Sequence, residues 1–249
     1  MQRWVPAPTV GTHQTLSAPA ILMSTVATSR KTAAFYDVDG TLIKTNVVHA
    51  YAYYAINAPS WRRKIFKTAE LLASIPLYWA ADKFDRALFN EAFYKNYKGF
   101  SEDRLVVLGQ EIFDNVIRPN IFEGATSLVE RSRRQGHDQI LVTGALDVIT
   151  EPLADFLGCD HFVANRLEIK DGIATGNLEK PLIAGANKAL WVRQYAEEQG
   201  YDLDGSFAYA DSGSDIPLLS VVGHPCAVNP DFEMKKNARA YDWPVLELK

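Results

Sequence analysis

The sequence predicts an α/β fold: a mainly parallel sheet between helices, with a large all-helical segment inserted after the first strand. Three short apolar runs end in polar residues: residues 33–36 lead into Asp37, residues 139–142 into Thr143, and residues 206–210 into Asp211. Such runs are typical of strands buried on both faces of a parallel sheet. Helical patterns follow the latter two runs, and this alternation favours ligand binding at the carboxyl ends of the strands.

Residues 1–31 are predicted to be a flexible leader outside the fold. Residues 1–34 contain three basic residues and no acidic residue, and they are rich in Ser, Thr, Ala and Pro. Pro19 and Ser24 interrupt the weakly apolar stretch 16–26, so a secretory signal core fits poorly. The composition also permits a transit peptide, or a true translation start at Met23.

The predicted core comprises residues 32–45 and 120–249. Helical patterns cover residues 148–157, 187–199 and 215–222. Residues 167–175 are predicted to form a hairpin with Asp171 and Gly172 in its turn, because this dipeptide favours tight hairpins. Residues 226–228 are predicted as a short strand, and residues 244–248 as an edge strand.

Residues 46–119 are predicted to be the inserted module, a helical cap joined to the core by two hinges. Apolar residues recur at helical spacing at Phe84, Leu88 and Phe89, and again over residues 105–116. Ser101, which follows Gly99, is a plausible helix N-cap. A crossover between parallel strands needs far fewer residues, so this length indicates a separate module.

Asp37 and Asp39 lie two positions apart at the end of the first predicted strand, followed by Gly40 and Thr41. Carboxylates at the end of an apolar strand are costly without a use. Residues two apart can face one pocket while Val38 turns into the core. We therefore expect Asp37 to attack phosphorus and Asp39 to handle the proton. The alternative is an ordinary turn, since Asp-Gly is a common turn dipeptide.

Three other residues are candidates for binding the phosphoryl group. Thr143 and Gly144 follow the second predicted strand and can donate a hydroxyl and an amide to phosphate oxygens. Lys188 begins a helix, where it can reach the phosphoryl group and keep the nucleophile ionised. Lys180 is the competing lysine, but it precedes Pro181 in a loop. The structural alternatives are an ordinary strand-to-helix turn and a solvated lysine.

A second acidic pair follows the third predicted strand. Asp211 ends that strand, and Asp215 lies one helical turn further on. Together with Asp37 and Asp39 they form a cluster of carboxylates that repel one another, and hard oxygen ligands of this kind suit Mg²⁺. Asp215 can also orient Asp211 or the lysine. Capping of the following helix is the alternative role, and it is compatible with metal binding.

Four motifs of this sequence resemble, in their order, those of the haloacid dehalogenase superfamily. They are Asp-x-Asp-Gly-Thr, a Thr after the second strand, a Lys, and Asp-Ser-x-x-x-Asp. The resemblance extends from Ala33 to the C terminus, and the insert resembles the cap of the phosphoserine phosphatase-like subgroup, subfamily IB. It implies a Rossmann-like core and a phosphomonoesterase that forms an aspartyl-phosphate on Asp37. It also implies Mg²⁺ bound by Asp37, the main-chain carbonyl of Asp39 and Asp211, with Asp215 in support.

The sequence departs from this subgroup at the positions that select the substrate. Phosphoserine phosphatases have a glutamate seven residues after the acid/base aspartate, and Asn46 stands there in this chain. They also have a cap arginine for the substrate carboxylate, a position that we align with Asn96. We therefore expect a small phosphorylated metabolite whose identity stays open, with Asn46 and His49 as candidates for substrate contact.

Composition narrows the class of protein. The 249 residues are 47% hydrophobic and 22% charged with a net charge of -4, which does not favour a nucleic-acid binder. No stretch reaches the ~20 apolar residues of a membrane-spanning helix. Two cysteines, Cys159 and Cys226, make no disulfide framework, although a single bridge stays open. We expect a cytoplasmic protein; the sequence leaves the oligomeric state undetermined.

Two alternative functions use the same residues. A phosphotransferase would pass the phosphoryl group to an alcohol acceptor. A lipid-phosphate phosphatase would act at a membrane surface, where the aromatic and basic stretch 61–67 and the apolar stretch 71–81 would make peripheral contact. Packing of these aromatic residues inside the cap is the interpretation that we favour.

Overall fold

The computed structural model of the chain describes residues 30–56, 65 and 86–249. At its centre lies a six-stranded sheet of order β3-β2-β1-β6-β7-β8 in which all neighbouring strands are parallel. The strands are β1 (Ala33–Tyr36), β2 (Asp138–Leu146), β3 (His161–Asn165), β6 (Phe207–Ala210), β7 (His224–Val228) and β8 (Val245–Leu246). The predicted strands 33–36, 139–142, 206–210 and 226–228 are confirmed, and β8 is the predicted edge strand.

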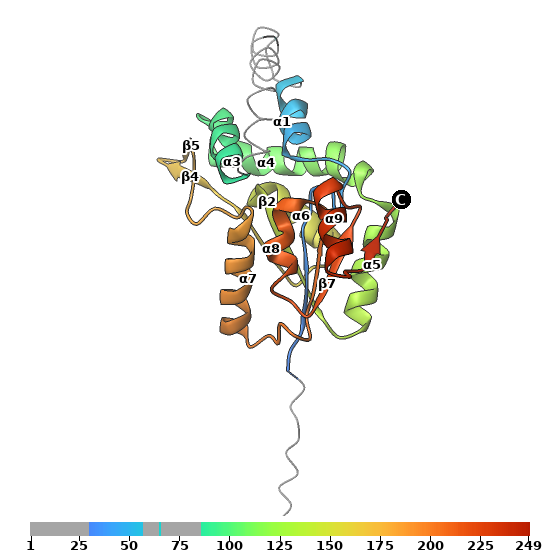
Figure 1. Cartoon of the computed structure of the whole chain (residues 1–249). Helices are drawn as coiled ribbons and strands as arrows, with labels where there is room; N and C mark the ends of the chain where they lie inside the picture. Colours follow the sequence, from blue (N-terminus) through green and yellow to red (C-terminus); the bar gives the residue numbers. More distant parts are fainter. Residues whose placement is uncertain (1–29, 57–64, 66–85) are drawn as a thin grey trace, which may run out of the picture.

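Helices cover both faces of the sheet and give three layers (Figure 1). The face that includes Phe35 and Ile140 packs against α7 (Ala186–Gln199), α8 (Ile216–Leu219) and α9 (Phe232–Ala240). The opposite face, with Tyr36 and Leu141, packs against α5 (Glu123–Arg134) and α6 (Asp147–Leu157). Alternate residues of one strand thus face the two helical layers, as the period of a strand requires. The predicted α/β, Rossmann-like class is confirmed.

Some core elements were not predicted or differ in length. β3, α5 and α9 were not predicted; β3 is a partly exposed edge strand, and α5 is a mostly polar helix with a narrow apolar stripe. The helix predicted over residues 215–222 is shorter: a 3₁₀ turn at Gly213–Asp215 precedes α8. β2 extends through Thr143 and Gly144, with an irregular register between Val142 and Leu146.

The described part of the inserted segment is helical, as predicted. It contains α1 (Val47–Ile56), α3 (Arg86–Tyr94), a 3₁₀ turn (Lys95–Tyr97), α4 (Glu102–Ile112), a π turn (Phe113–Ile117) and a 3₁₀ turn (Arg118–Asn120). The Ser101 side chain accepts a hydrogen bond from the amide of Arg104 and caps α4, as predicted. The stretches 61–67 and 71–81, which would contact a membrane only in the lipid-phosphate alternative, lie outside the described residues except for Ile65. The domain boundaries at 46 and 119 stay a prediction.

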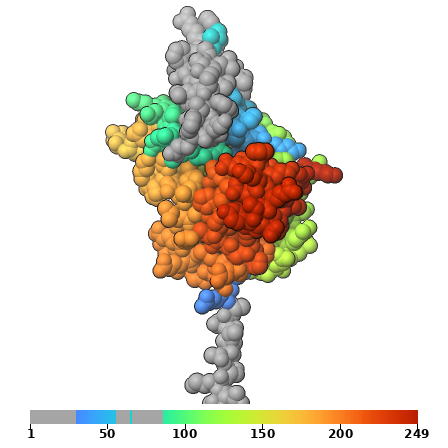
Figure 2. Space-filling model, viewed as in Figure 1, coloured from blue at the N-terminus to red at the C-terminus, as the bar shows by residue number. Residues whose placement is uncertain are grey.

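Two of the contacts between the cap and the core involve α4 and the predicted hairpin. Helix α4 crosses above the sheet and packs closely on α6: a Cβ added at Gly109 would lie 2.0 Å from the carbonyl oxygen of Val148 (Figure 1). The predicted hairpin, β4 (Leu167–Lys170) and β5 (Ile173–Leu178), lies beside the cap, where Gly99 donates to the Ala174 carbonyl at 2.9 Å (Figures 1 and 2). The core hairpin therefore supports the cap.

Two further expectations have outcomes in the described residues. Over residues 30–56, 65 and 86–249, no helix combines the length and the apolar character needed to cross a membrane. Cys159 and Cys226, which the sequence left open as a bridged pair, are both free cysteines.

Candidate active site

The loop after β1 directs two carboxylates into one cavity. The carbonyl of Val38 accepts hydrogen bonds from the amides of Thr41 at 3.2 Å and Leu42 at 2.9 Å, which closes a tight turn. Val38 is only 3% exposed, whereas Asp37 and Asp39 both line the same cavity of about 220 Å³. The predicted alternation, with Val38 in the core between two functional carboxylates, matches this arrangement.

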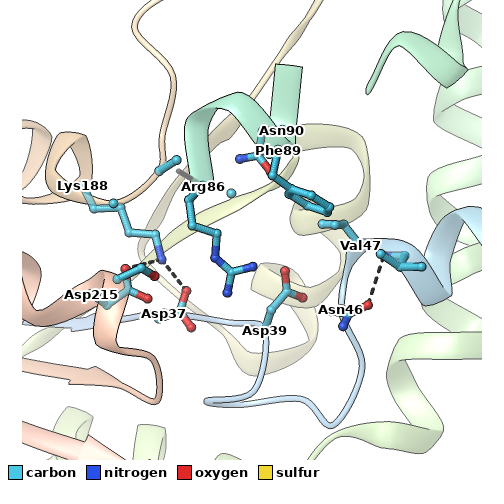
Figure 3. Close-up of a pocket in the computed structure, with 14 residues that line it drawn as sticks. Asp37, Asp39, Asn46, Val47, Arg86, Phe89, Asn90, Lys188 and Asp215 are labelled. Atoms are coloured by element: carbon cyan, nitrogen blue, oxygen red, sulfur yellow. Dashed lines mark hydrogen bonds and ion pairs between the residues drawn. The ribbon is translucent and has the colours of Figure 1, made fainter. Parts of the chain in front are cut away.

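Asp37 is held by cationic and hydroxyl donors. Lys188 donates from Nζ to Oδ1 of Asp37 at 2.6 Å, and the Thr41 hydroxyl donates to Oδ2 at 2.9 Å. Lys188 also lies 2.8 Å from Oδ1 of Asp215 (Figure 3). Asp37 and Lys188 are 4% and 5% exposed, so their charges interact with little screening by water. The arrangement therefore places a positive charge beside one oxygen of the Asp37 carboxylate and a hydroxyl donor on the other.

Lys188 keeps its charge despite burial. Burial acts to lower its pKa, but the charges and hydrogen bonds of Asp215 and Asp37 outweigh burial and raise the pKa above the ordinary value. Lys180, the competing candidate, forms an ion pair with Glu91 of α3 and is mostly exposed. The structure therefore brings Lys188, and not Lys180, to Asp37.

Three carboxylates form a site that fits a divalent cation. Oxygen atoms of Asp37, Asp211 and Asp215 all lie within 4.8 Å of one another. Burial, followed by the negative charges of Asp37 and Asp215, raises the pKa of Asp211 to about 8. Burial and the neighbouring carboxylates both disfavour the charged form of Asp211, and a hard cation such as Mg²⁺ would offset this cost. The donor set therefore fits the predicted ion.

Gly40 lets this acidic cluster form. Its φ angle is +83°, and a Cβ added there would lie 2.1 Å from Oδ2 of Asp211. A side chain at position 40 would therefore occupy the place of the Asp211 carboxylate. The sequence marked Gly40 as a turn residue, but its approach to a residue 171 positions away is visible only in the fold.

Asp39 lies on the cap side of Asp37. Burial, followed by the charge of Asp37, raises its pKa to about 7. A carboxyl group with this pKa can both give and take a proton near neutral pH. This shift is consistent with the predicted acid/base role of Asp39.

The two residues predicted at the end of β2 lie at different depths. Gly144 lines the cavity, whereas Thr143 is fully buried and its hydroxyl accepts a hydrogen bond from the Ala145 amide at 3.1 Å. Gly144 has little room for a side chain: an added Cβ would lie 3.1 Å from Nδ2 of Asn90. Contact of Thr143 and Gly144 with phosphate stays a prediction.

Of the two candidate substrate contacts, only Asn46 lines the cavity. The Asn46 side chain also accepts a hydrogen bond from the amide of Val48 at 3.1 Å, as an N-cap of α1 would. His49 is exposed and bonds to Asn46 through Nδ1 at 2.8 Å. His49 therefore reaches the cavity only through Asn46 in this structure.

The cap contributes residues that the sequence did not single out. Arg86, Phe89 and Asn90 of α3 line the cavity, and the Arg86 guanidinium points towards Asp37 and Asp39 (Figure 3). Asn96 is not part of this lining; its amide donates to the Phe93 carbonyl at 2.7 Å. The alignment of Asn96 with the cap arginine is therefore wrong, because helical patterns repeat every turn and permit several registers. The cavity does contain a cap arginine.

Comparison with known proteins agrees with this geometry. The family model for haloacid dehalogenase-like hydrolases matches residues 34–220. The chain belongs to this family. The match includes the four motifs that the sequence analysis assigned, from Asp37 to Asp215.

Curated relatives in this family include several phosphatases. A Streptomyces azureus protein named for inhibition of morphological differentiation is 32% identical, over 88% of this chain and 79% of its own length. A phosphoserine phosphatase of Mycobacterium tuberculosis is 31% identical, over 87% of this chain and 71% of its own length. A histidinol-phosphatase of Neisseria meningitidis is 29% identical, over 88% of this chain and all of its own length. These relatives support the predicted enzyme class, a phosphoric monoester hydrolase.

Solved structures of other proteins share the fold. A Bordetella pertussis protein of unknown function has a TM-score of 0.78 and 24% identity, over 88% of this chain and 99% of its own. A substrate-bound phosphoserine phosphatase has a TM-score of 0.66 and 19% identity, over 87% of this chain and 93% of its own. At these identities the likeness concerns the fold.

Proposed function

We propose that the protein is a Mg²⁺-dependent phosphomonoesterase that hydrolyses a small phosphorylated metabolite through an aspartyl-phosphate intermediate. One observation carries the proposal: Asp37 is held by the buried Lys188 at 2.6 Å and faces the same cavity as Asp39. A charged lysine lies beside the proposed nucleophile, and the raised pKa of Asp39, about 7, suits an acid.

The reaction runs in two steps on these residues. A carboxylate oxygen of Asp37 attacks phosphorus, the bond from phosphorus to the leaving oxygen breaks, and Asp39 gives its proton to that oxygen. Asp39 then takes a proton from a water molecule, whose oxygen attacks the phosphoryl group and restores Asp37. Lys188 offsets negative charge on the phosphoryl oxygens in both steps.

Asp37, Asp211 and Asp215 are the residues that would hold Mg²⁺, because their oxygen atoms lie within 4.8 Å of one another. The ion would supply positive charge to the phosphoryl oxygens. A main-chain ligand from Asp39 stays a prediction. Removal of the ion by a chelator is expected to abolish turnover, and added Mg²⁺ to restore it.

The cavity supports a small leaving group that carries no ammonium group. Its volume of about 220 Å³ is small for a ligand site. The leaving-group side includes Arg86 and the amides of Asn46 and Asn90, so a carboxylate or hydroxyl group has partners there. Among the described lining residues on this side, an ammonium group would face the neutral Asn46 and the cationic Arg86, with Asp39 as the nearest acidic group and the proposed proton donor.

Three phosphate esters of one carbon skeleton test this substrate class. 3-Phosphoglycerate has a hydroxyl group where phosphoserine has an ammonium group, and glycerol 3-phosphate has a hydroxymethyl group in place of the carboxylate. We expect kcat/KM for 3-phosphoglycerate to exceed the value for phosphoserine and the value for glycerol 3-phosphate by about tenfold or more each. A preference for phosphoserine would contradict the charge argument.

The enzyme activity itself is tested by Asp37→Asn with p-nitrophenyl phosphate as substrate. We expect turnover to fall by about 10³-fold or more, because the amide cannot attack phosphorus. Asp147→Asn is the matched control: Asp147 pairs with Arg166 at 2.9 Å outside the acidic cluster, and its loss should leave turnover within about twofold. Equal activity of the two variants would reject Asp37 as the nucleophile.

Phosphotransfer to an alcohol is measured in the same assay. With glycerol added as acceptor, a hydrolase releases inorganic phosphate and p-nitrophenol in equal amounts. A phosphotransferase would release p-nitrophenol in excess and form glycerol phosphate, so the product ratio separates the two reactions.

A further inference from the structure

Helix α3 of the cap contacts the core at a backbone group beside the cavity. The Tyr94 hydroxyl donates a hydrogen bond to the carbonyl oxygen of Gly144 at 3.0 Å. Gly144 lines the cavity, and Tyr94 is only 1% exposed. Burial raises the pKa of Tyr94 well above its ordinary value, so the hydroxyl stays protonated and acts as a donor. One hydrogen bond therefore joins the cap to the proposed phosphate-binding loop, which is the irregular end of β2 that contains Thr143 and Gly144.

The same carbonyl has a second donor that belongs to the core. Nδ2 of Asn165, at the end of β3, donates to the Gly144 carbonyl at 2.9 Å. Oδ1 of Asn165 accepts from the amide of Ile183 at 2.9 Å. Ile183 precedes Ala184 and Gly185, which line the cavity at the start of α7. Asn165, at 2% exposure, thus connects the loops on two sides of the cavity.

The bond from Tyr94 exists only when α3 is docked on the core. Gly144 permits close docking, because a Cβ at this position would lie 3.1 Å from Nδ2 of Asn90 on the same helix. A buried hydroxyl without a partner is costly, so docking of α3 is favoured in the position in which this bond forms. The Asn165 bond needs no cap residue. Docking of α3 therefore forms the Tyr94 hydrogen bond to Gly144 and leaves the Asn165 hydrogen bond unchanged.

We propose that Tyr94 is a positioning residue that links docking of the cap to the geometry of the loop at Gly144, with Asn165 as its fixed counterpart in the core. This proposal rests on the proposed phosphomonoesterase function, in which the loop binds the phosphoryl group. Tyr94 acts through Gly144: its hydroxyl fixes the Gly144 carbonyl, and the loop then holds phosphate in the position for attack by Asp37.

The test compares Tyr94→Phe with Tyr97→Phe. Tyr97 lies on the following turn, its ring centre is 5.8 Å from that of Tyr94, and it is also 1% exposed. Its hydroxyl makes no hydrogen bond with any residue in the described ranges. Both substitutions remove one buried hydroxyl from the same aromatic cluster, but only Tyr94→Phe removes a bond to the core. Urea unfolding measures the effect of each on stability.

The first measurement is the Kd of inorganic phosphate, by isothermal titration calorimetry with Mg²⁺ present. A lost hydrogen bond of ordinary strength predicts a rise of about tenfold for Tyr94→Phe, whereas Tyr97→Phe should stay within about twofold. The second measurement is hydrolysis of p-nitrophenyl phosphate, in which Tyr94→Phe should lower kcat/KM by a similar factor. Equal phosphate affinity of the two variants overturns the positioning role, whatever their stabilities.

A further variant separates this role from general loosening of the cap. Glu91→Gln breaks the exposed ion pair between α3 and Lys180 but leaves the bond to Gly144. It should leave phosphate affinity within about twofold. If it weakens phosphate binding as much as Tyr94→Phe, the specific role of Tyr94 is rejected. If wild-type protein binds phosphate but hydrolyses no ester, the proposed function fails while phosphate affinity still decides the role of Tyr94.

Discussion

Substitution of Gly40 by alanine tests how the acidic cluster is assembled. The added Cβ would lie 2.1 Å from Oδ2 and 2.7 Å from Cγ of Asp211, well inside the contact distance of about 3.5 Å. The Asp211 side chain would have to move by more than an ångström, which would disturb its place in the acidic cluster. Displacement of a catalytic group by about 1 Å costs about 10²-fold in rate, or about 2.7 kcal/mol. We therefore expect kcat/KM to fall by about 10²-fold.

Gly136→Ala is the matched control for the backbone. Gly136 has a φ angle of +88°, close to the +83° of Gly40, but a Cβ there would meet no atom within 4 Å. Both alanines therefore carry the left-handed penalty of about 1–2 kcal/mol, and only Gly40→Ala displaces a carboxylate. The backbone penalty can therefore be separated from the displacement of Asp211, because Gly136→Ala should change stability alone.

The assay is hydrolysis of p-nitrophenyl phosphate across a titration of Mg²⁺, with urea unfolding of each variant. We expect Gly136→Ala to lose stability but keep its activity and Mg²⁺ affinity. Gly40→Ala should lose activity and bind Mg²⁺ more weakly, while still folding. If both alanine variants keep the same kcat/KM, contact between Gly40 and Asp211 does not govern the site, and the reasoning is refuted.

Two further predictions concern charge. Lys188→Met should lower the free energy of unfolding at neutral pH by about 3–5 kcal/mol, because it leaves buried carboxylates unpaired. Lys180→Met breaks an exposed ion pair and should lower it by about 1 kcal/mol or less. Urea unfolding measures both changes. Equal losses would contradict the burial argument. The pKa values of Asp39 and Asp211 are raised from 3.8 to about 7 and about 8, so the metal-free fold favours their protonated forms. That stability is full below about pH 4 and is lost as pH rises through about 8. The rise in Tm on adding Mg²⁺ should therefore be larger at about pH 8.5 than at about pH 5.5, and an equal rise would contradict the carboxylate site.

Much of the candidate site follows from local sequence. Asp37 and Asp39 flank Val38, and a strand-end turn places the two carboxylates on one side whatever surrounds them. Asp211 and Asp215 could be predicted because parallel strands present their carboxyl ends at one edge of a sheet, and Lys188 because it begins a helix. The structure indeed places Lys188 2.6 Å from Asp37. The weak edge strand β3 was missed, because its partly exposed residues show no clear period.

The cap residues could not be predicted in the same way. Arg86 has no local pattern that separates it from other arginines, and its place beside Asp39 depends on how α3 docks. The mistaken choice of Asn96 has the same cause, because a helix offers a similar face at every turn. Tyr94, Asn165 and Gly144 belong to three separate segments of the chain that meet only in the fold. Neither Tyr94 nor Asn165 therefore stands out in the sequence.

The sequence by itself determined the α/β class and the family, and it predicted the carboxylate and lysine chemistry, because these depend on short motifs and on the period of buried strands. Only the tertiary structure decided which cap residues enter the cavity, why position 40 must be glycine, and how Tyr94 and Asn165 hold Gly144. These contacts join segments far apart in the chain, with Gly40 against Asp211 and Tyr94 against Gly144. Close contacts of this kind are fixed by packing between elements, and packing is not encoded in any local pattern.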